Sequence, residues 1–134
     1  MDCIFCKIAK KEIPNHTVYE DDQVIAFLDI FPRVEGHTVV IPKKHGGTIF
    51  DFTPEELGSV IHGVQKAAER VQKILTPDGF TIGLNHGEIA GQAVPHLHFH
   101  ILPRHKGDNG GSMHSIVKQE NMRLVAEISE LFKI

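Results

Sequence analysis

Three histidines alternate with apolar residues in the run His96-Leu97-His98-Phe99-His100. Residues two apart on a β-strand point to the same face, so the run predicts a row of three imidazoles at steps of roughly 6 to 7 Å. Leu97, Phe99 and Ile101 then point to the opposite face, where they pack under a helix. Because burying histidines without partners is costly, the row indicates chemistry rather than core packing.

Two kinds of chemistry suit such a row. In one, two or three of the imidazoles bind a catalytic zinc. In the other, the central imidazole of His98 attacks phosphorus through one ring nitrogen while an acceptor holds the other nitrogen. Hydrogen-bond donors must then meet the phosphoryl charge. The segment Asn85 to Val94, directly before the row, contains Gly87 and Gly91, and backbone amides of such a loop can form an anion-binding concavity.

The elements around these residues predict an α+β domain with an antiparallel sheet. Apolar and β-branched runs predict strands at Thr17–Glu20, Val24–Leu28, Thr38–Ile41, Phe80–Leu84 and His96–Leu102. The segment Thr53-Pro54-Glu55-Glu56 has the residues of a capped helix start, and apolar positions at helical spacing continue to Leu75. Shorter patterns predict a knuckle with one helical turn at Cys3 to Lys11, a linker at Lys106 to Ser112 and a helix at Met122 to Phe132.

Length and composition set the class of protein. The 134 residues fit one domain spanning 1–134, and the net charge of −3 argues against a general nucleic-acid binder. The N-terminus shows no basic-then-apolar signal segment, and no apolar run is long enough to span a bilayer. Two cysteines, Cys3 and Cys6, are too few and too close for a secreted disulfide framework. We therefore expect a cytoplasmic protein that binds neither nucleic acid nor membrane.

The histidine row and its surroundings resemble the signature of the histidine triad (HIT) superfamily. The similarity covers nearly the whole chain and is greatest to the Hint branch of nucleotide-binding phosphoramidases. The matching motifs are Cys3–Ile8, Glu12–Pro14, Tyr19–Asp21, Ala26–Ile30, Gly36–His45, Gly91–Gln92 and Pro103–Arg104. The resemblance implies a sheet of about five strands with one long helix and a C-terminal helix. It also implies a homodimer in which a helix and a strand pair across a two-fold axis.

The resemblance assigns roles to single residues. It implies that His98 attacks the α-phosphate of a purine nucleotide conjugate, that a nucleotidyl-histidine intermediate forms, and that water hydrolyses it. His100 then lies beside the phosphate, His37 supports it, and Asp29 binds the ribose hydroxyls. The remaining positions implied to bind nucleotide are Phe5, Ile8, Phe27, Ile30, Asn85, Gly91, Gln92, Ala93 and Val94. For Phe5, Ile8, Phe27 and Ile30, which match the base pocket, core packing is the alternative.

A second site follows from the cysteines. A Cys-x-x-Cys pair such as Cys3 and Cys6 suits one tetrahedral zinc, which needs two further ligands. The resemblance supplies His45 and His96 as those ligands. Such a Cys2His2 set is a closed, structural site, in which His96 anchors the row and is not a free acid or base. The alternative is that both cysteines are free thiols near a frayed terminus.

One departure from the family pattern leaves other functions open. Ala93 occupies a position that often carries Ser or Thr, so a hydroxyl near the phosphate or leaving group is missing. The absence of this hydroxyl affects phosphoramidase activity more than nucleotide binding. The alternatives are a nucleotide-binding module with little catalysis, a diadenosine polyphosphate hydrolase, and a zinc hydrolase that uses the row as ligands.

Overall fold

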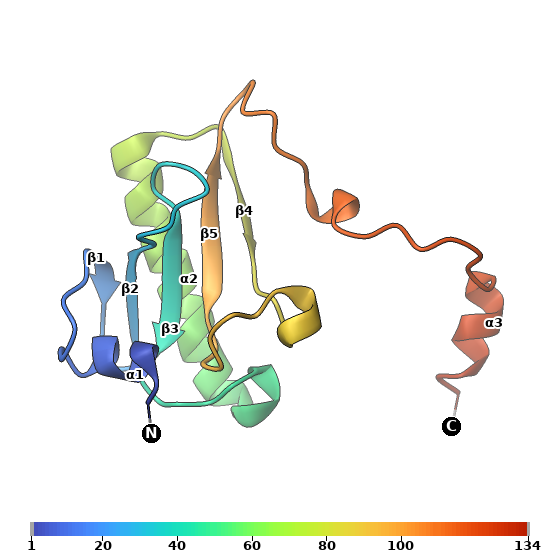
Figure 1. Ribbon diagram of the computed structural model, residues 1–134, viewed down its shortest axis with the longest axis horizontal. Coiled ribbons are helices and arrows are strands. Elements are labelled where there is room, and N and C mark those ends of the chain that lie inside the picture. Colours follow the sequence, from blue (N-terminus) through green and yellow to red (C-terminus); the bar gives the residue numbers. More distant parts are fainter. Residues whose placement is uncertain (1, 134) are drawn as a thin grey trace.

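The computed structural model describes residues 2–133, and a single five-stranded sheet organises them (Figure 1). The strands are β1 (Thr17–Glu20), β2 (Val24–Leu28), β3 (Thr38–Pro42), β4 (Gly79–Gly83) and β5 (Phe99–Arg104). They lie in the order β1-β2-β3-β5-β4, and every neighbouring pair is antiparallel. The predicted α+β fold with about five antiparallel strands is therefore confirmed.

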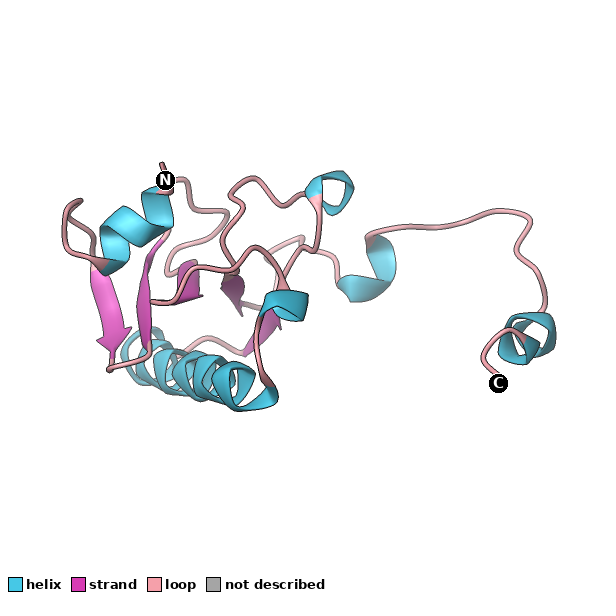
Figure 2. Cartoon of the chain, turned by 90° about the horizontal axis from the view of Figure 1, so that it is seen from below, coloured by secondary structure: helices cyan, strands magenta, loops and turns pink. Residues whose placement is uncertain are grey.

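The long helix α2 (Pro54–Leu75) covers one face of the sheet (Figure 2). It begins as predicted: the Thr53 hydroxyl accepts a hydrogen bond from the Glu56 amide, and the Glu56 carboxylate accepts one from the Thr53 amide. The core beneath the helix consists of Val24, Ala26, Val40, Val60, Val64, Ala67 and Ile101. Contact is closest at Gly63, where an added Cβ would lie 2.4 Å from Cγ2 of Val24.

A short helix, α1 (Ile4–Ala9), covers the opposite face, where Ile8, Ile25, Phe27, Val39 and Ile41 form a second cluster. His100 lies directly opposite Val39 in the β3–β5 ladder, so its side chain is on this α1 face. Phe99 and Ile101 pack in the cluster beneath α2, as predicted. The sheet therefore separates a packed face under α2 from the face that carries the histidine.

The predicted bounds of the last strand, His96 to Leu102, are wrong by two to three residues, because β5 begins at Phe99 and ends at Arg104. Before the strand, local bonds replace the ladder: the Leu97 amide donates to the Gly46 carbonyl over 2.7 Å, and the His96 amide donates to Val94 over 2.8 Å. At the other end, Pro103 pairs with Phe80 of β4 beyond the last β3 pair. A strand position without a second neighbour tolerates proline.

The chain after β5 leaves the domain as an extended tail that runs past β4 (Figure 1). The helix predicted at Met122 to Phe132 is shorter than expected, because α3 covers only Val125–Glu130. Three 3-10 turns complete the fold: η1 (Ile49–Asp51), η2 (Glu88–Ala90) and η3 (Met113–Ser115). None of the helices within residues 2–133 combines the length and apolarity needed to cross a membrane.

Candidate active site and metal centre

Two clusters of polar side chains meet at His96 and His98, at the start of β5. The first cluster brings together the four predicted metal ligands, with Cys3 capping α1, Cys6 inside it, and His45 following β3. Their ligand atoms all lie within 4.8 Å of one another. Cys3 and His96 are buried, and neither cysteine is in a disulfide.

Distances in this cluster match a tetrahedral zinc. With Zn–S of about 2.3 Å and Zn–N of about 2.0 Å, tetrahedral angles put sulfur and nitrogen ligands about 3.5 Å apart and two nitrogens about 3.3 Å apart. Sγ of Cys3 lies 3.4 Å from Nδ1 of His96, and Sγ of Cys6 lies 3.3 Å from Nδ1 of His45. The two Nδ1 atoms are 3.2 Å apart.

The environment of His96 also suits a metal ligand. Its Nε2 donates a hydrogen bond to the Pro42 carbonyl over 2.8 Å, so the proton is on Nε2 and the Nδ1 lone pair faces the thiols. Burial lowers the pKa of His96, which keeps the ring neutral, as a ligand must be. Burial, followed by the neighbouring Cys3, raises the pKa of the Cys6 thiol. Only a cation in the cluster would favour the thiolate there.

The second cluster contains His98, His100 and His37, and hydrogen bonds fix the proton positions on these rings. His98 is buried, and its Nδ1 donates to the His96 carbonyl over 2.8 Å. Because a carbonyl can only accept, the proton of neutral His98 is on Nδ1. The Nε2 lone pair of His98 is therefore available to attack an electrophile.

His100 has the opposite tautomer. The Arg33 amide donates to Nδ1 of His37 over 3.2 Å, so neutral His37 has its proton on Nε2. That Nε2 donates to Nδ1 of His100 over 2.9 Å, which leaves the proton of His100 on its Nε2. Burial, more than the neighbouring histidines, lowers the pKa of His100 to about 4, and burial also lowers the pKa of His37. Both rings are therefore neutral near pH 7.

The rings of His98 and His100 are neighbours, with centroids 5.1 Å apart and planes at 72°. The pair thus combines a lone pair on His98 Nε2 with a hydrogen-bond donor on His100 Nε2. A nucleophile beside a preorganised donor is what attack on a phosphoryl group requires.

Asp29 joins this second cluster, because its Oδ2 lies 3.6 Å from Nε2 of His37. Asp29, His37 and His100 also place three ligand atoms within 4.8 Å of one another. However, a histidine that binds metal through one nitrogen normally donates from the other. Here the other nitrogen of His37 accepts from the Arg33 amide, which favours a hydrogen-bonded relay over a metal site.

The glycine-containing loop before the row is fastened by Gln92. Oε1 of Gln92 accepts from the Gly87 amide, and its Nε2 donates to the carbonyls of Gly47 and Val94. Gly87 and Gly91 have φ angles of +92° and +110°, which favour glycine. Since both ends of the Gln92 amide are bonded to the backbone, the loop's own amides are the groups left to bind an anion.

Residues of the expected base pocket divide by exposure. The Phe5 ring lies 5.1 Å from the His98 ring and 5.7 Å from the Phe27 ring, edge to face in both cases. Ile8 and Phe27 are buried in the core cluster, whereas Ile30 is 73% exposed. Asn85 packs against Gly91, and Ala93 is exposed on the loop. Only Phe5 thus contacts the row and the core together.

Sequence reasoning missed the groups that set the tautomers. The Pro42 carbonyl, the His96 carbonyl and the Arg33 amide orient three imidazoles, and all three groups belong to the main chain. Every residue carries such groups, so no residue type marks them. Only the fold brings them beside the rings.

Comparison with known proteins places this arrangement among others. The model of the HIT domain family matches residues 10–107. An uncharacterized HIT-like protein of Methanocaldococcus jannaschii is 53% identical over 106 residues, covering 79% of this chain and 81% of that protein. The adenosine 5'-monophosphoramidase of Schizosaccharomyces pombe is 36% identical, covering 99% of this chain and all of that protein.

Solved structures show the same architecture. A HIT family protein from Bacillus anthracis superposes with a TM-score of 0.83 at 39% identity, over 97% of this chain and 92% of that one. An alignment of that extent continues into the tail. A zinc-bound histidine triad family protein from Mycobacterium smegmatis superposes with a TM-score of 0.76 at 38% identity, over 81% and 79% of the two chains.

Proposed function

Because the chain belongs to the HIT domain family, we propose that it hydrolyses a nucleotide conjugate at the α-phosphate, with His98 as the nucleophile. The opposite tautomers of His98 and His100 carry this proposal. They place an attacking lone pair and a hydrogen-bond donor on neighbouring rings, as a two-step displacement at phosphorus needs.

The first step forms a bond between Nε2 of His98 and the α-phosphorus and breaks the bond to the leaving group. The leaving group departs with the electron pair and takes up a proton. The imidazole then carries a positive charge, which the His96 carbonyl stabilises through its bond to Nδ1. His100 Nε2 and the amides of the loop donate to the phosphoryl oxygens. In the second step water attacks phosphorus, the phosphorus–nitrogen bond breaks, and His98 regains its lone pair.

Named relatives support a purine nucleoside phosphoramidate as the substrate, since one of them is an adenosine 5'-monophosphoramidase. In this proposal the carboxylate of Asp29, which is 22% exposed beside His37, binds the ribose hydroxyls. Phe5, with Phe27, Ile8 and Ile30, borders the base. Asn85, Gly91, Gln92, Ala93 and Val94 form the loop that surrounds the phosphate.

The test is replacement of the nucleophile. We expect His98→Ala to reduce turnover of an adenosine phosphoramidate by about 1000-fold or more, since no other group supplies the attacking nitrogen. His62→Ala is the control, because His62 is exposed on α2, on the opposite face of the sheet. Intact-mass spectrometry should detect a nucleotidyl adduct in the wild-type protein and none in His98→Ala. Unchanged turnover in His98→Ala would refute the proposal.

Ala93 favours a second candidate, a nucleotide-binding module with little catalysis. This loop position has no hydroxyl to meet the leaving group. Calorimetry with AMP and GMP, beside turnover assays of phosphoramidates and a diadenosine polyphosphate, separates the two functions. Binding without turnover of any substrate favours the module.

We also propose that zinc occupies the Cys3, Cys6, His45 and His96 cluster. The ligand distances, the donor bond of His96 to Pro42 and the zinc-bound relative support it. When bound, the metal would supply a closed structural link between α1 and the start of β5. The side chain of His96 would then take no part in acid–base chemistry.

A further inference from the structure

The tail after β5 presents an unusual amount of apolar surface. Eight of its large apolar side chains are between 60% and 86% exposed, and we call them the apolar tail surface: Met113, Ile116, Val117, Met122, Leu124, Val125, Leu131 and Phe132. Eight side chains of this size expose on the order of 800 Å². Single exposed apolar residues are ordinary, but a group of this size marks an interaction site.

The tail gains little from its own domain. Among the described residues, the hydrogen bonds of side chains and turns in 113–133 stay within the tail. Its helix α3 has six residues, whereas isolated helices below about 12–15 residues are marginal in water. A helix this short needs a packing surface that the same copy does not supply.

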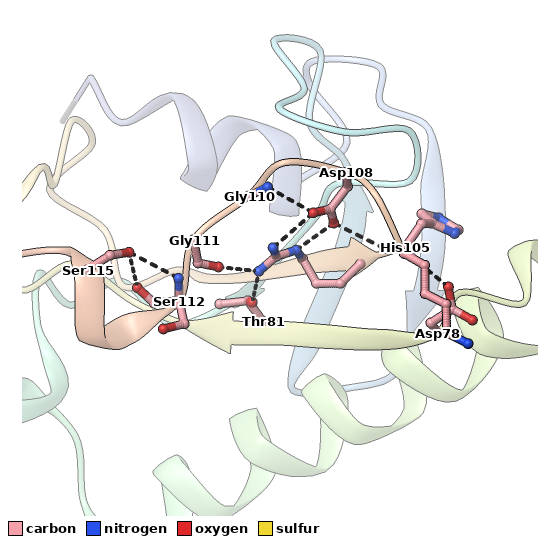
Figure 3. Close-up of polar contacts among 10 residues, drawn as sticks. Asp78, Thr81, His105, Asp108, Gly110, Gly111, Ser112 and Ser115 are labelled. Carbon is pink, nitrogen blue, oxygen red and sulfur yellow. Dashed lines mark hydrogen bonds and ion pairs between the residues drawn. The ribbon is translucent and has the colours of Figure 1, made fainter.

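The root of the tail is nevertheless held firmly, and this sets its direction. Arg104 binds Asp108 through two hydrogen bonds of 2.8 and 3.0 Å. The same guanidinium donates to the Gly111 carbonyl and to the hydroxyl of Thr81 in β4; Figure 3 shows Asp108, Gly111 and Thr81 gathered at this point. Asp108 also accepts from the amides of His105 and Gly110. These bonds join the tail root to β4.

The strand β4 is the edge of the sheet, and its outer side has no neighbouring strand among the described residues. Figure 1 shows the tail crossing beyond this edge, away from the other strands. A second copy related by a two-fold axis beside β4 would lie where the tail runs, and its own tail would reach back over the first copy. About 800 Å² per partner is the usual size of a stable interface.

We propose that the apolar tail surface packs on a second copy of this chain, so that two copies exchange their tails. This exchange is independent of the chemistry at His98. It gives α3 the packing surface that its own domain lacks, and it uses the open edge at β4.

The first experiment is sedimentation equilibrium on full-length variants. Replacing Leu124, Val125 and Phe132 together by Ser should weaken the dimer about 100-fold or more. The matched control replaces Lys118, Gln119 and Glu120 by Ser in the same tail and should shift the dissociation constant less than about 3-fold. Circular dichroism and unfolding in urea verify that both variants keep the folded domain. An unchanged dimer constant in the apolar variant, or a monomeric wild type, would overturn the proposal.

The second experiment asks which copy the tail touches. Copies labelled with ¹⁴N and ¹⁵N are mixed, left to exchange, and treated with an amine-reactive cross-linker that captures Lys118 or Lys133 of the tail. Cross-links from these lysines to lysines of the domain should contain both isotopes in about half of the products, because random exchange of copies makes half of the dimers mixed. Cross-links of one isotope only would show that each tail folds back on its own domain and would refute the exchange.

Discussion

At the scale of single residues, burial governs the protonation of His100. Its pKa is lowered from an ordinary 6.5 to about 4, first by burial and then by the nearby histidines. The unfolded chain therefore takes up this proton near pH 6.5, and the folded chain only near pH 4. Because the unfolded state binds more protons in this window, the contribution of His100 to stability is intact above pH 6.5 and is lost as the pH falls toward 4.

This argument predicts the behaviour of His100→Asn. Between pH 6.5 and about 4.5, the free energy of unfolding should fall less steeply in the variant than in the wild type. Urea unfolding at several pH values measures both slopes. Above pH 7 the difference in free energy between the two proteins should stay constant. Identical slopes in the acid window would show that His100 titrates normally in the folded chain.

At the scale of elements, the contact between α2 and β2 depends on a missing side chain. A Cβ at Gly63 would lie 2.4 Å from Cγ2 and 3.2 Å from Cβ of Val24, whereas a Cβ at Gly58 of the same helix would meet nothing within 4 Å. Valine is stiff at χ1, so Val24 cannot turn aside without moving β2.

Two alanine substitutions in one helix should therefore have opposite signs. Gly63→Ala should destabilise the fold by about 1–3 kcal/mol through overpacking. Gly58→Ala should stabilise it by up to about 1 kcal/mol, because alanine favours the helix. Thermal and urea unfolding of both variants give the comparison. A stabilised Gly63→Ala would mean that the helix can move away from the sheet at little cost.

Sequence reasoning succeeded for elements whose signals are local. Thr53 and Glu56 formed the predicted reciprocal cap, and the spacing of Phe99 and Ile101 predicted the face that packs under α2. It failed where a distant group decides. The start of β5 moved because Gly46, from another loop, accepts the Leu97 amide. The helix at Met122 to Phe132 shortened to α3, because apolar spacing implies a packing surface that one copy does not provide.

The candidate site was predictable in its members more than in its geometry. The spacing of Cys3 and Cys6 indicated a metal, and the resemblance supplied His45 and His96, which the fold brings together. The chain could not reveal that the Gln92 amide is consumed by backbone partners. Nor could it reveal the tautomers, because these depend on main-chain groups that reach the rings only after folding.

At the scale of the molecule, the metal cluster connects α1 to the loop after β3 and to the start of β5. We expect one zinc per chain, and we expect Cys6→Ser or a chelator to lower the midpoint of thermal unfolding by about 10 °C or more, as loss of a structural zinc usually does. AMP affinity should fall too, since Phe5 of α1 packs on the His98 ring.

Metal analysis and calorimetry measure both effects. The control Lys10→Ser, at an exposed position at the end of α1, should change neither quantity. If the double variant Cys3→Ser/Cys6→Ser kept its zinc and lost activity on chelation, the metal would be catalytic and would lie elsewhere.

The main-chain partners of the imidazoles have a consequence for how this site withstands mutation. The Arg33 amide and the His96 carbonyl persist whatever side chain occupies positions 33 and 96. Drift in residue identity at those positions therefore leaves the pattern of protons on His37, His98 and His100 intact. An insertion, a deletion or a proline at position 33 would disturb that pattern without altering any of the histidines. Relatives that keep all three histidines but change the length of these loops are thus the ones in which an apparently complete signature would be inert.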